Sequence, residues 1–545
     1  MIQFGEWMPD QAGITEALQE AVNVIPQAIG YAPFPNSVNL STDASESLKS
    51  MFVAKYAGET SLFAAGGTKL FKYSSDDFGL DDVSKTVRVI SNVARTSNVT
   101  TITTSATHGY TTGDVVTVAA TTNTSVNGSF TITGTPTTTT FTYANTGTNI
   151  TSVAATGSTS IQAYTTADRF YFTQFGKKVI CSNGNSKLQS WELGTSSTFQ
   201  DLDASAPNAK FVAVVRDFVV AANIAGNENK VIWSDINDET DWTPSAASQS
   251  DYQLLPDGGD IMGLTGGEFG TIFLERAIVR MSYIGSPLFF QFDTIAKNIG
   301  CYSSGSIAQF GNLSFFLSDN GFYMCDGQTV TPIGAEKVDK YFFSILDVNQ
   351  IDTMSAAIDY ANKLVVWQFR DIFAKDKLFV YNWQSKKWTI CDTDSTFVAT
   401  AATTGVTLEG LDAYGTVDSI GTSWDSRLWA GGKFVFAGIK SAKLITFTGS
   451  PKTGYVTTGD LGNGNQSIVM LAKPKVDNGA GSVSVASRQL LNEVPVFSTA
   501  VASDSEGRVS LRSSGKYHRV RVYPTGSNWD IAVGTEVDIV PQGGR

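Results

Sequence analysis

The chain has 545 residues, more than one hydrophobic core usually organises, so we expect several structural units. Charged residues make up only 17% of it, while glycine, threonine, serine and aromatic residues are plentiful, which favours short strands and tight turns over helices. The formal net charge of −12 argues against broad binding of a nucleic-acid backbone, which needs clustered lysine and arginine. It does not prevent a duplex from passing nearby.

Several other classes of protein are poorly supported. No apolar run approaches the length of a membrane-spanning helix, and MIQFGEWMPD has neither a basic start nor an apolar segment, so we expect a soluble protein made without a signal peptide. The only histidines are His108 and His518, so we expect no metal site, no cofactor and no histidine-based catalysis. Four widely separated cysteines are expected to be reduced, buried thiols: Cys181, Cys301, Cys325 and Cys391.

The N-terminal segment, residues 1–45, contains the best helix candidate of the chain. The stretch ITEALQEAVNVI, residues 14–25, is rich in helix-forming residues, and Pro26 would end it. Elsewhere the sequence predicts few helices.

Short apolar segments recur at intervals typical of β-propeller blades. They begin at Phe52, Phe170, Phe211, Ile261, Ile307, Met354 and Phe397. From Phe170 onward the intervals are 41, 50, 46, 47 and 43 residues, the range of four-stranded blades. We therefore expect a propeller of about six to eight blades, with the first blade at 46–85 and the remaining blades at 163–440.

One unit shows the expected blade in detail. The stretch GNLSFFLSDNGFYMCDGQTVTPIG, residues 311–334, predicts short antiparallel strands at 307–310, 313–317, 322–325 and 328–333. Asn320-Gly321 is a signal for a two-residue type I′ hairpin, and Asp326-Gly327 repeats it.

Two regions depart from the regular spacing of the blades. The interval from Phe52 to Phe170 is 118 residues, and excising 86–162, which is rich in threonine and almost uncharged, leaves 41. We interpret 86–162 as an inserted β-sandwich-like domain, because its threonines alternate with apolar residues. Residues 441–545 read as longer alternating strands and predict a C-terminal β-module, although 427–449 could complete the last blade.

Acidic residues beside turns are the first candidates for chemistry. Asp319 and Asp326 could act as a carboxylate pair on a sugar, but aspartate is favoured at turns because it caps its own backbone, and we prefer that interpretation. An alternating acidic stretch resembles a calcium loop but lacks its glycine and its distal glutamate: Asp235, Asn237, Glu239 and Asp241. We expect a solvated acidic loop there, and likewise at 76–82.

The remaining motifs give no reactive centre. There is no GxSxG stretch, and GLTGGEFG is not followed by the lysine and hydroxyl residue of a phosphate-binding loop. One basic cluster stands out: Arg508, Arg512, Lys516, Arg519 and Arg521. It could touch nucleic acid, but a charged strand face at a subunit contact is the preferred interpretation. We therefore predict no catalytic, cofactor-binding or metal-binding residues, and the sequence leaves DNA-binding residues unknown.

In this order, the segments resemble a known family. The resemblance rests on these stretches of the sequence: FGEWMPD, NVIPQAIGYAPFP, KFVAVVRDFVVAAN, VIWSDINDETDW, RMSYIGSPLFFQFDTIAKNIGC, GNLSFFLSDNGFYMCDGQTVTPIGAEKVDKYFF, NKLVVWQF and GKYHRVRVYPTGSNWDIAVGTEVDIVPQGGR. They are similar to the tail nozzle, or hub, proteins of short-tailed bacteriophages, also called packaged-DNA stabilisation proteins, and to related prophage tail proteins. The resemblance covers nearly everything except the threonine-rich insert.

The resemblance implies a non-enzymatic structural protein of the virion's short tail, assembled in the host cytoplasm. It implies a homo-oligomeric ring, typically a hexamer, below the portal and adaptor rings, whose lumen retains packaged DNA until ejection. Expected partners are adaptor- and portal-side tail proteins, tail fibres or spikes, and genomic double-stranded DNA passing without sequence-specific binding. From the negative charge we add the hypothesis of an acidic lumen that lets DNA slide.

Two rival functions stay open. A carbohydrate-binding or glycan-degrading tail propeller would stack sugars on tryptophans such as Trp233, Trp242, Trp383 and Trp388, although aromatic residues in blades more often belong to the core. A generic intracellular scaffold propeller would be expected to remain a monomer.

Overall fold

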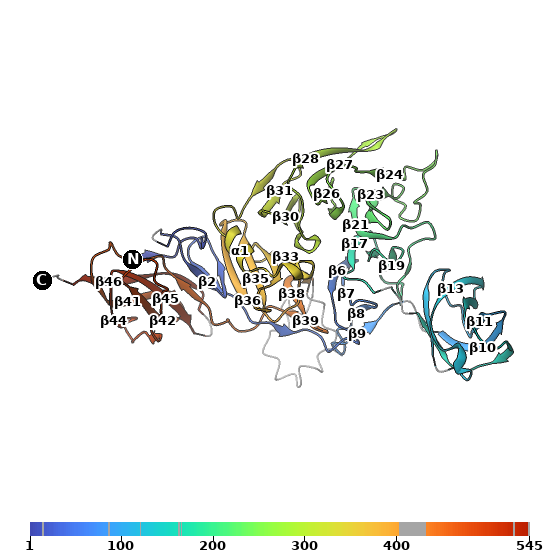
Figure 1. Ribbon diagram of the computed structural model, residues 1–545, viewed down its shortest axis with the longest axis horizontal. Coiled ribbons are helices and arrows are strands. Elements are labelled where there is room, and N and C mark those ends of the chain that lie inside the picture. Colours follow the sequence, from blue (N-terminus) through green and yellow to red (C-terminus); the bar gives the residue numbers. More distant parts are fainter. Residues whose placement is uncertain are drawn as a thin grey trace.

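The protein is built almost entirely of β-strands, arranged in three bodies (Figure 1). The structure is a computed structural model, and it describes all residues except 14–15, 85–87, 120, 162–163, 165, 403–431, 527–528 and 543–545. Within the described residues there is one α-helix, α1 (Asp339–Ile345), and three short 3-10 helices, η1 (Thr124–Val126), η2 (Ser304–Ser306) and η3 (Val348–Thr353). In Figure 1 the C-terminal strands lie at the left, a propeller at the centre and the inserted domain at the right.

The central body is a β-propeller, and seven four-stranded antiparallel blades are described. The first five in chain order are β6 (Ser50–Tyr56), β7 (Glu59–Ala65), β8 (Leu70–Tyr73), β9 (Leu80–Asp82); β17 (Tyr171–Phe175), β18 (Lys178–Ser182), β19 (Gln189–Glu192), β20 (Gln200–Asp201); β21 (Ala209–Val215), β22 (Phe218–Ile224), β23 (Asn227–Trp233), β24 (Asp251–Leu254); β25 (Ile261–Thr265), β26 (Gly270–Leu274), β27 (Ala277–Gly285), β28 (Phe289–Lys297); β29 (Ala308–Phe310), β30 (Leu313–Ser318), β31 (Gly321–Cys325), β32 (Val330–Pro332). The last two are β33 (Ser355–Asp359), β34 (Leu364–Arg370), β35 (Asp376–Asn382), β36 (Lys387–Asp392); and β37 (Phe397–Ala402), β38 (Phe434–Lys440), β39 (Lys443–Thr446), β5 (Val38–Asn39). The predicted propeller is confirmed.

The ring of blades is closed by strands from two distant parts of the chain. Strand β5 pairs with β39, with Asn39 opposite Ile445, so the N-terminal segment supplies the outer strand of the last blade. Strand β37 of that blade packs against β6 of the first blade. The first and second blades meet through the stacked rings of Phe52 and Phe172, whose centroids are 5.6 Å apart. Closure leaves only the outer strands of blades as edges, which limits unwanted pairing between molecules.

The blade formed by β29–β32 follows the predicted strands but not the predicted turns. Ser318 pairs with Gly321, so the two-residue loop is Asp319-Asn320 rather than Asn320-Gly321. The second loop has four residues, because Cys325 pairs with Val330. The type I′ expectation at Asn320-Gly321 is therefore wrong, and so is the idea that Asp326-Gly327 repeats it.

Gly321 is required by a neighbour rather than by the turn alone. Its φ of +149° disfavours a side chain, and a Cβ there would lie 2.2 Å from the carboxylate of Asp339. The Oδ1 atom of Asp339 accepts a hydrogen bond from the backbone N–H of Phe322 at 3.2 Å. The absent side chain thus makes room for a buried carboxylate at the start of α1.

The inserted domain is a compact β-structure of seven strands. They are β10 (Arg88–Thr96), β11 (Val99–Thr104), β12 (Val115–Ala119), β13 (Gly128–Thr137), β14 (Thr140–Ala144), β15 (Ile150–Ala154) and β16 (Ser158–Ile161). The long strands β10 and β13 pair with different neighbours along their lengths and so join two layers. Between these layers lies a core that includes Val93, Ile102, Phe141 and Tyr143. All seven strands fall inside the expected range 86–162.

The C-terminal body is a sandwich that includes the N-terminal segment. One layer contains β1 (Ile2–Gln3), β3 (Val24–Pro26), β4 (Tyr31–Pro33), β41 (Ser467–Asp477), β44 (Val509–Gly515) and β46 (Ile531–Pro541). The other contains β40 (Tyr455–Thr457), β42 (Ala480–Arg488), β43 (Val501–Ala502) and β45 (Tyr517–Thr525).

These pairings correct three expectations about the ends of the chain. Residues 1–45 are not a separate segment, because their strands are shared between the sandwich and the last blade. The propeller extends past the expected boundary at residue 440, and the alternative that 427–449 complete the last blade holds for their described part, since β38 and β39 belong to that blade. The helix expected at 14–25 is wrong: the described part of this stretch contains β2 (Glu20–Val22) and the start of β3.

Strand β2 joins the propeller to the sandwich. It runs parallel to β36 of the sixth blade, with Val22 opposite Ile390, and antiparallel to β40, with Ala21 opposite Val456. The result is one nine-stranded sheet from β33 to β43. A single hydrophobic core also runs through both bodies, from Phe322 and Trp367 in the blades to Val483 and Val520 in the sandwich. The two bodies are therefore rigidly connected.

Candidate functional site

The two aspartates in residues 311–334 serve the turns beside them. Oδ1 of Asp326 accepts hydrogen bonds from the backbone N–H groups of Thr329 at 2.6 Å and Gln328 at 2.8 Å. These bonds lower the pKa of Asp326. Asp319 accepts a bond from the adjacent Ser318 hydroxyl. Asp326 therefore caps its turn, in line with the preferred interpretation, whereas Asp319 lies in the turn between β30 and β31 and accepts its bond from a side chain rather than from a backbone N–H.

The acidic stretch at 235–241 is likewise engaged within the protein. Asp235 accepts from the backbone N–H of Gln249 at 2.7 Å, Asp241 accepts from Thr243, and Glu239 forms an ion pair with Lys178. At 76–82, Asp77 caps Gly79, and Asp82 pairs with Lys69 at 2.9 Å. Among the described residues, no group of three or more metal-ligating side chains could hold a metal ion.

Both histidines and all four cysteines are buried. His108 lies in the inserted domain with Nε2 3.1 Å from the carbonyl oxygen of Thr137. His518 lies in the sandwich between the hydroxyls of Ser467 and Ser487, at 2.9 and 2.7 Å, and burial lowers its pKa. The cysteines are free thiols, as predicted, and burial raises the pKa of Cys301 and of Cys391 to about 12.

The basic cluster of the sequence is divided by the fold. Arg508 pairs with Glu506, and Arg512 is exposed. Arg519 and Arg521 instead turn towards the junction of sandwich and propeller, where each meets a carboxylate. The expected single charged face is therefore not what the structure forms.

A cleft of about 1090 Å³ lies at this junction. We call it the junction cleft. Its lining combines the N-terminal segment, α1, the sixth blade and the sandwich: Trp7, Pro9, Gln19, Glu20, Val22, Tyr341, Ile345, Asp371, Phe373, Lys377, Ile390, Cys391, Asp392, Tyr455, Val494, Pro495, Val496, Phe497, Arg519 and Arg521. No sequence motif could have revealed this cleft, because the lining comes from segments up to about 500 residues apart.

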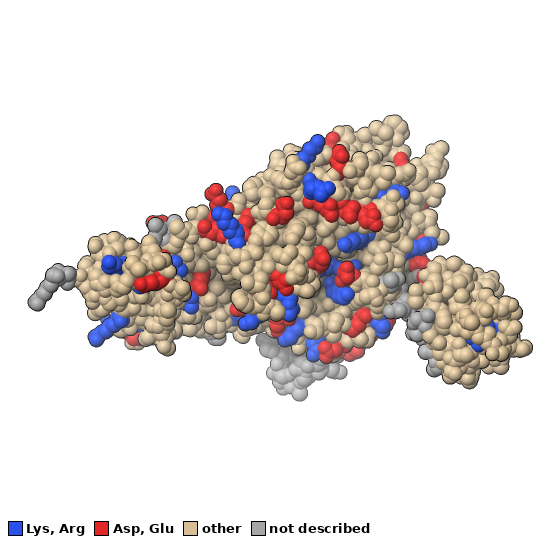
Figure 2. All heavy atoms as spheres, viewed as in Figure 1, with Lys and Arg blue, Asp and Glu red and all other residues tan. Residues whose placement is uncertain are grey.

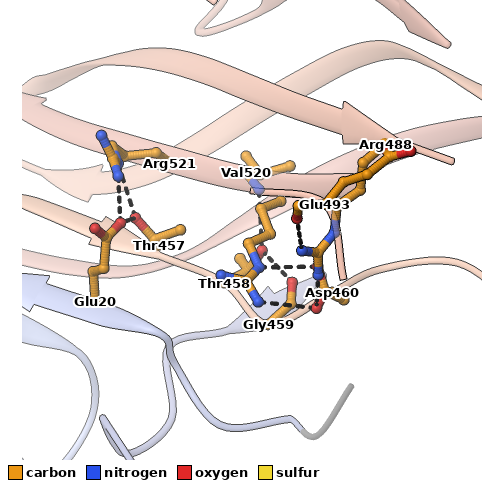
Figure 3. A network of polar contacts seen from close by, with 10 residues as sticks. Glu20, Thr457, Thr458, Gly459, Asp460, Arg488, Glu493, Val520 and Arg521 are labelled. Carbon is orange, nitrogen blue, oxygen red and sulfur yellow. Dashed lines mark hydrogen bonds and ion pairs between the residues drawn. The ribbon is translucent and has the colours of Figure 1, made fainter. Parts of the chain in front are cut away.

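A buried ion-pair network stiffens one wall of the junction cleft (Figure 3). The Asp460 carboxylate, almost fully buried, is held by two of the three guanidinium nitrogens of Arg519, Nε at 2.9 Å and Nη2 at 3.0 Å, and by Arg488. Arg488 also donates to the carbonyl oxygen of Glu493 at 2.6 Å. This bond attaches the loop 489–500 to the body of the sandwich.

Arg521 forms the second part of the network. Its guanidinium pairs with Glu20 and donates to the hydroxyl of Thr457 at 3.0 Å. It also lies between two aromatic rings, 3.8 Å from the centroid of Phe497 and 4.4 Å from that of Tyr455. Arg521 therefore ties β2 to β45 and to the loop 489–500 at once.

Side chains from several blades meet around Arg169. Arg169 donates to the carbonyl oxygen of Met354 at 2.8 Å, and its guanidinium lies 5.0 Å from the centroid of Phe397. The two cavities described around Arg169 have volumes of about 270 and 180 Å³. Neither is large enough to hold a nucleic-acid duplex.

Three of the four tryptophans proposed for sugar stacking are buried: Trp233, Trp242 and Trp388. Trp383 is partly exposed and belongs to a row of aromatic rings that we call the aromatic arc. Centroid distances are 4.9 Å from Trp383 to Phe310, 5.7 Å from Phe310 to Tyr360 and 5.0 Å from Tyr360 to Phe434. The arc crosses three successive blades.

Comparisons with known proteins match the fold at low similarity. No protein-family model matches the chain, and no curated protein matches its sequence. A computationally designed protein, Ika8, is 10% identical with a TM-score of 0.32, covering 75% of this chain and 99% of its own. A chain of the mitotic checkpoint complex is 10% identical with a TM-score of 0.36, covering 77% and 95%. The Pan2 WD40 domain of Neurospora crassa is 9% identical with a TM-score of 0.26, covering 56% and 79%.

None of the helices in the described part of the chain is both long and apolar enough to cross a membrane.

Proposed function

We propose that this protein is a structural subunit of the short tail of a bacteriophage. Identical copies form a ring below the portal and adaptor, and the ring lumen retains the packaged DNA and conducts it at ejection. The proposal begins from the ordered segments that resemble nozzle proteins. It is supported by the architecture, because a ring under genome pressure needs stiff subunits with defined surfaces.

The observation that carries the proposal is the nine-stranded sheet from β33 to β43. Through it, the propeller and the sandwich form one elongated body without a flexible linker between them. The small cavities around Arg169 are in line with this arrangement, in which DNA passes between subunits through a lumen that only several copies enclose.

The charge distribution suits passage of DNA without adhesion. Residues 163–440 contain 31 aspartates and glutamates against 21 lysines and arginines, whereas residues 441–545 contain 8 against 11. An acidic propeller facing the lumen would repel phosphates and lower friction. The acidic-lumen hypothesis fails if the pore-facing surface of the ring is predominantly basic.

Electron microscopy of the protein mixed with its portal and adaptor proteins tests the proposal. We expect closed rings attached end-on to the adaptor. Free single subunits in the presence of both partner rings would contradict it.

The aromatic arc favours one alternative, a glycan-binding tail propeller. Rings exposed in a row are suited to stacking on sugars, and the Nζ of Lys55 lies 4.1 Å from the centroid of Phe434 at one end. Incubation with host-surface polysaccharide tests it. If the protein binds the polysaccharide, and if Trp383→Ala and Tyr360→Ala each weaken that binding at least tenfold, this alternative is supported. If the protein neither binds nor degrades the polysaccharide, the alternative is contradicted.

A further inference from the structure

Exposed apolar side chains gather at two places far apart on the molecule. Eleven large apolar side chains among the described residues are more than half exposed. Five lie on the two loops that form the rim of the junction cleft: Ile372, Phe373, Leu490, Val494 and Val496. Two more, Ile284 and Leu288, lie at the end of the β27–β28 hairpin. Apolar patches of this kind on soluble proteins mark contact surfaces.

The rim of the junction cleft is an unusually open apolar surface. Phe373 is 74% exposed, and Val494 and Val496 are 82% and 81% exposed on the loop 489–500. From residue 494 to 503 this part of the chain carries no charge. Four of the charged side chains deeper in the cleft pair with one another, Glu20 with Arg521 and Lys377 with Asp392, while Asp371 accepts hydrogen bonds from the backbone N–H groups of Phe373 and Lys375. The cleft therefore has an apolar entrance, and these charged side chains at its floor already have partners.

The β27–β28 hairpin has matching properties. It projects from the rim of the propeller at the top right of Figure 1, and its end is drawn uncharged in Figure 2. No charged residue occurs between Arg280 and Asp293. At its end Ile284 is 51% and Leu288 is 68% exposed. Nothing in the described chain pairs with the outer side of β28, which is left as a sheet edge.

Size and charge make the two surfaces complementary. Strands lie about 4.8 Å apart and a sheet with its side chains is about 10 Å thick, so the last three residue pairs of a hairpin fill roughly 1000 Å³. The junction cleft measures about 1090 Å³. Copies that each carry a net charge of −12 repel one another, and contact through the uncharged hairpin end and the apolar rim of the cleft avoids bringing like charges together.

The positions of the two surfaces require different copies. The hairpin leaves the fourth blade, whereas the junction cleft lies between the sixth blade and the sandwich, near β2 and β36 in Figure 1. A hairpin cannot reach the cleft of its own molecule. Contact between two different surfaces of identical copies places the copies head to tail. Such contacts generate a closed ring when the rotation from one copy to the next adds up to a full turn.

We propose that the end of the β27–β28 hairpin of one copy inserts between the rim loops of the junction cleft of the next copy. Ile284 and Leu288 then pack against Phe373, Val494 and Val496. The inference rests on the proposed ring and names the contact that builds it.

Two charge substitutions test the contact: Leu288→Asp on the hairpin and Val494→Asp on the cleft rim. Both positions are exposed, so the folded subunit should keep its thermal unfolding midpoint. We expect each variant to raise the dissociation constant of the assembly at least a hundredfold in sedimentation experiments. Val89→Asp, at an exposed apolar position of the inserted domain, is the matched control and should assemble like the wild type.

Mixing the two variants gives the sharper readout. Leu288→Asp keeps an intact cleft and Val494→Asp keeps an intact hairpin, so the mixture should form one-to-one dimers and nothing larger. If both variants assemble as the wild type does, the proposed hairpin contact is overturned, but the ring proposal stands. A wild-type protein that stays monomeric even with portal and adaptor proteins would overturn both.

Discussion

Asp339 is a buried carboxylate at the start of α1. Burial raises its pKa to about 6, with the nearby Asp10 charge adding to the effect and the hydrogen bond from Phe322 opposing it. Asp10 itself accepts hydrogen bonds from the backbone N–H groups of Lys340 and Tyr341 at the start of α1. The start of α1 therefore brings two acidic groups together, and one of them, Asp339, binds a proton more readily than an aspartate in water.

Asp339 should make the stability of the protein depend on acid pH. Its pKa is higher in the folded state than its ordinary value of 3.8, so the folded state binds the additional proton. The favourable contribution of the protonated Asp339 to the free energy of unfolding is fully present below about pH 4. It is lost as the pH rises through about 6. Asp339→Asn should raise the free energy of unfolding at pH 7 by about 2 kcal/mol and flatten this dependence.

Denaturant unfolding between pH 4 and pH 7 measures the effect. The control is Asp319→Asn, an exposed acid in the same blade, which should leave the pH profile unchanged. If Asp339→Asn proves less stable at pH 7 than the wild type, its carboxylate is required in ionised form and the interpretation is wrong.

At the scale of elements, strand β2 holds the two large bodies together. It has only three residues, yet it completes the sheet between β36 and β40, and its Glu20 pairs with Arg521. Because the hydrophobic core is continuous across this strand, we expect the propeller and the sandwich to unfold in one transition.

Ala21→Pro should uncouple them. Proline removes a backbone donor and is poorly tolerated inside a sheet, and Ala21 is completely buried. We expect calorimetry to show two separate transitions, with the propeller the more stable. Thr499→Pro, in an exposed loop of the sandwich, is the matched control. A single transition in Ala21→Pro would show that β2 is not the coupling element.

The inserted domain should be separable from the rest. Its first and last strands lie side by side, with Arg88 opposite Thr159, so the chain enters and leaves at one point. Among the described residues, the 3.4 Å bond from the Thr111 hydroxyl to Asp201 is one contact with the propeller. Replacing 86–162 by a short glycine-serine linker should leave the unfolding midpoint of the propeller within about 3 °C. Loss of the folded propeller would contradict this independence.

Local patterns predict the blades and the insert, because each blade pairs strands close in sequence. Blade spacing, the threonine-rich composition of 86–162 and most strands of residues 311–334 could therefore be read directly. The N-terminal strands could not, since Ala21 pairs with Val456 and Asn39 with Ile445, and long-range pairing overrides the helix preference of residues 14–25. The junction cleft could not be predicted either, because its lining residues come from segments that are far apart in the sequence.

At the scale of the whole molecule, rigidity and charge are the two properties that bear on function. The propeller and sandwich form one body, its propeller is acidic, and its exposed apolar side chains concentrate at the hairpin and the cleft rim. Figure 2 shows how few charges the inserted domain carries: residues 88–161 contain only Arg88, Arg95 and Asp114. Such a domain adds little electrostatic repulsion wherever it sits in an assembly.

The mass of the purified protein in solution, measured by light scattering alone and with its portal and adaptor proteins, tests the central claim most directly. A ring subunit predicts a discrete species at a whole-number multiple of 58.3 kDa, formed alone or on the adaptor. A single species of 58.3 kDa under both conditions would contradict the account.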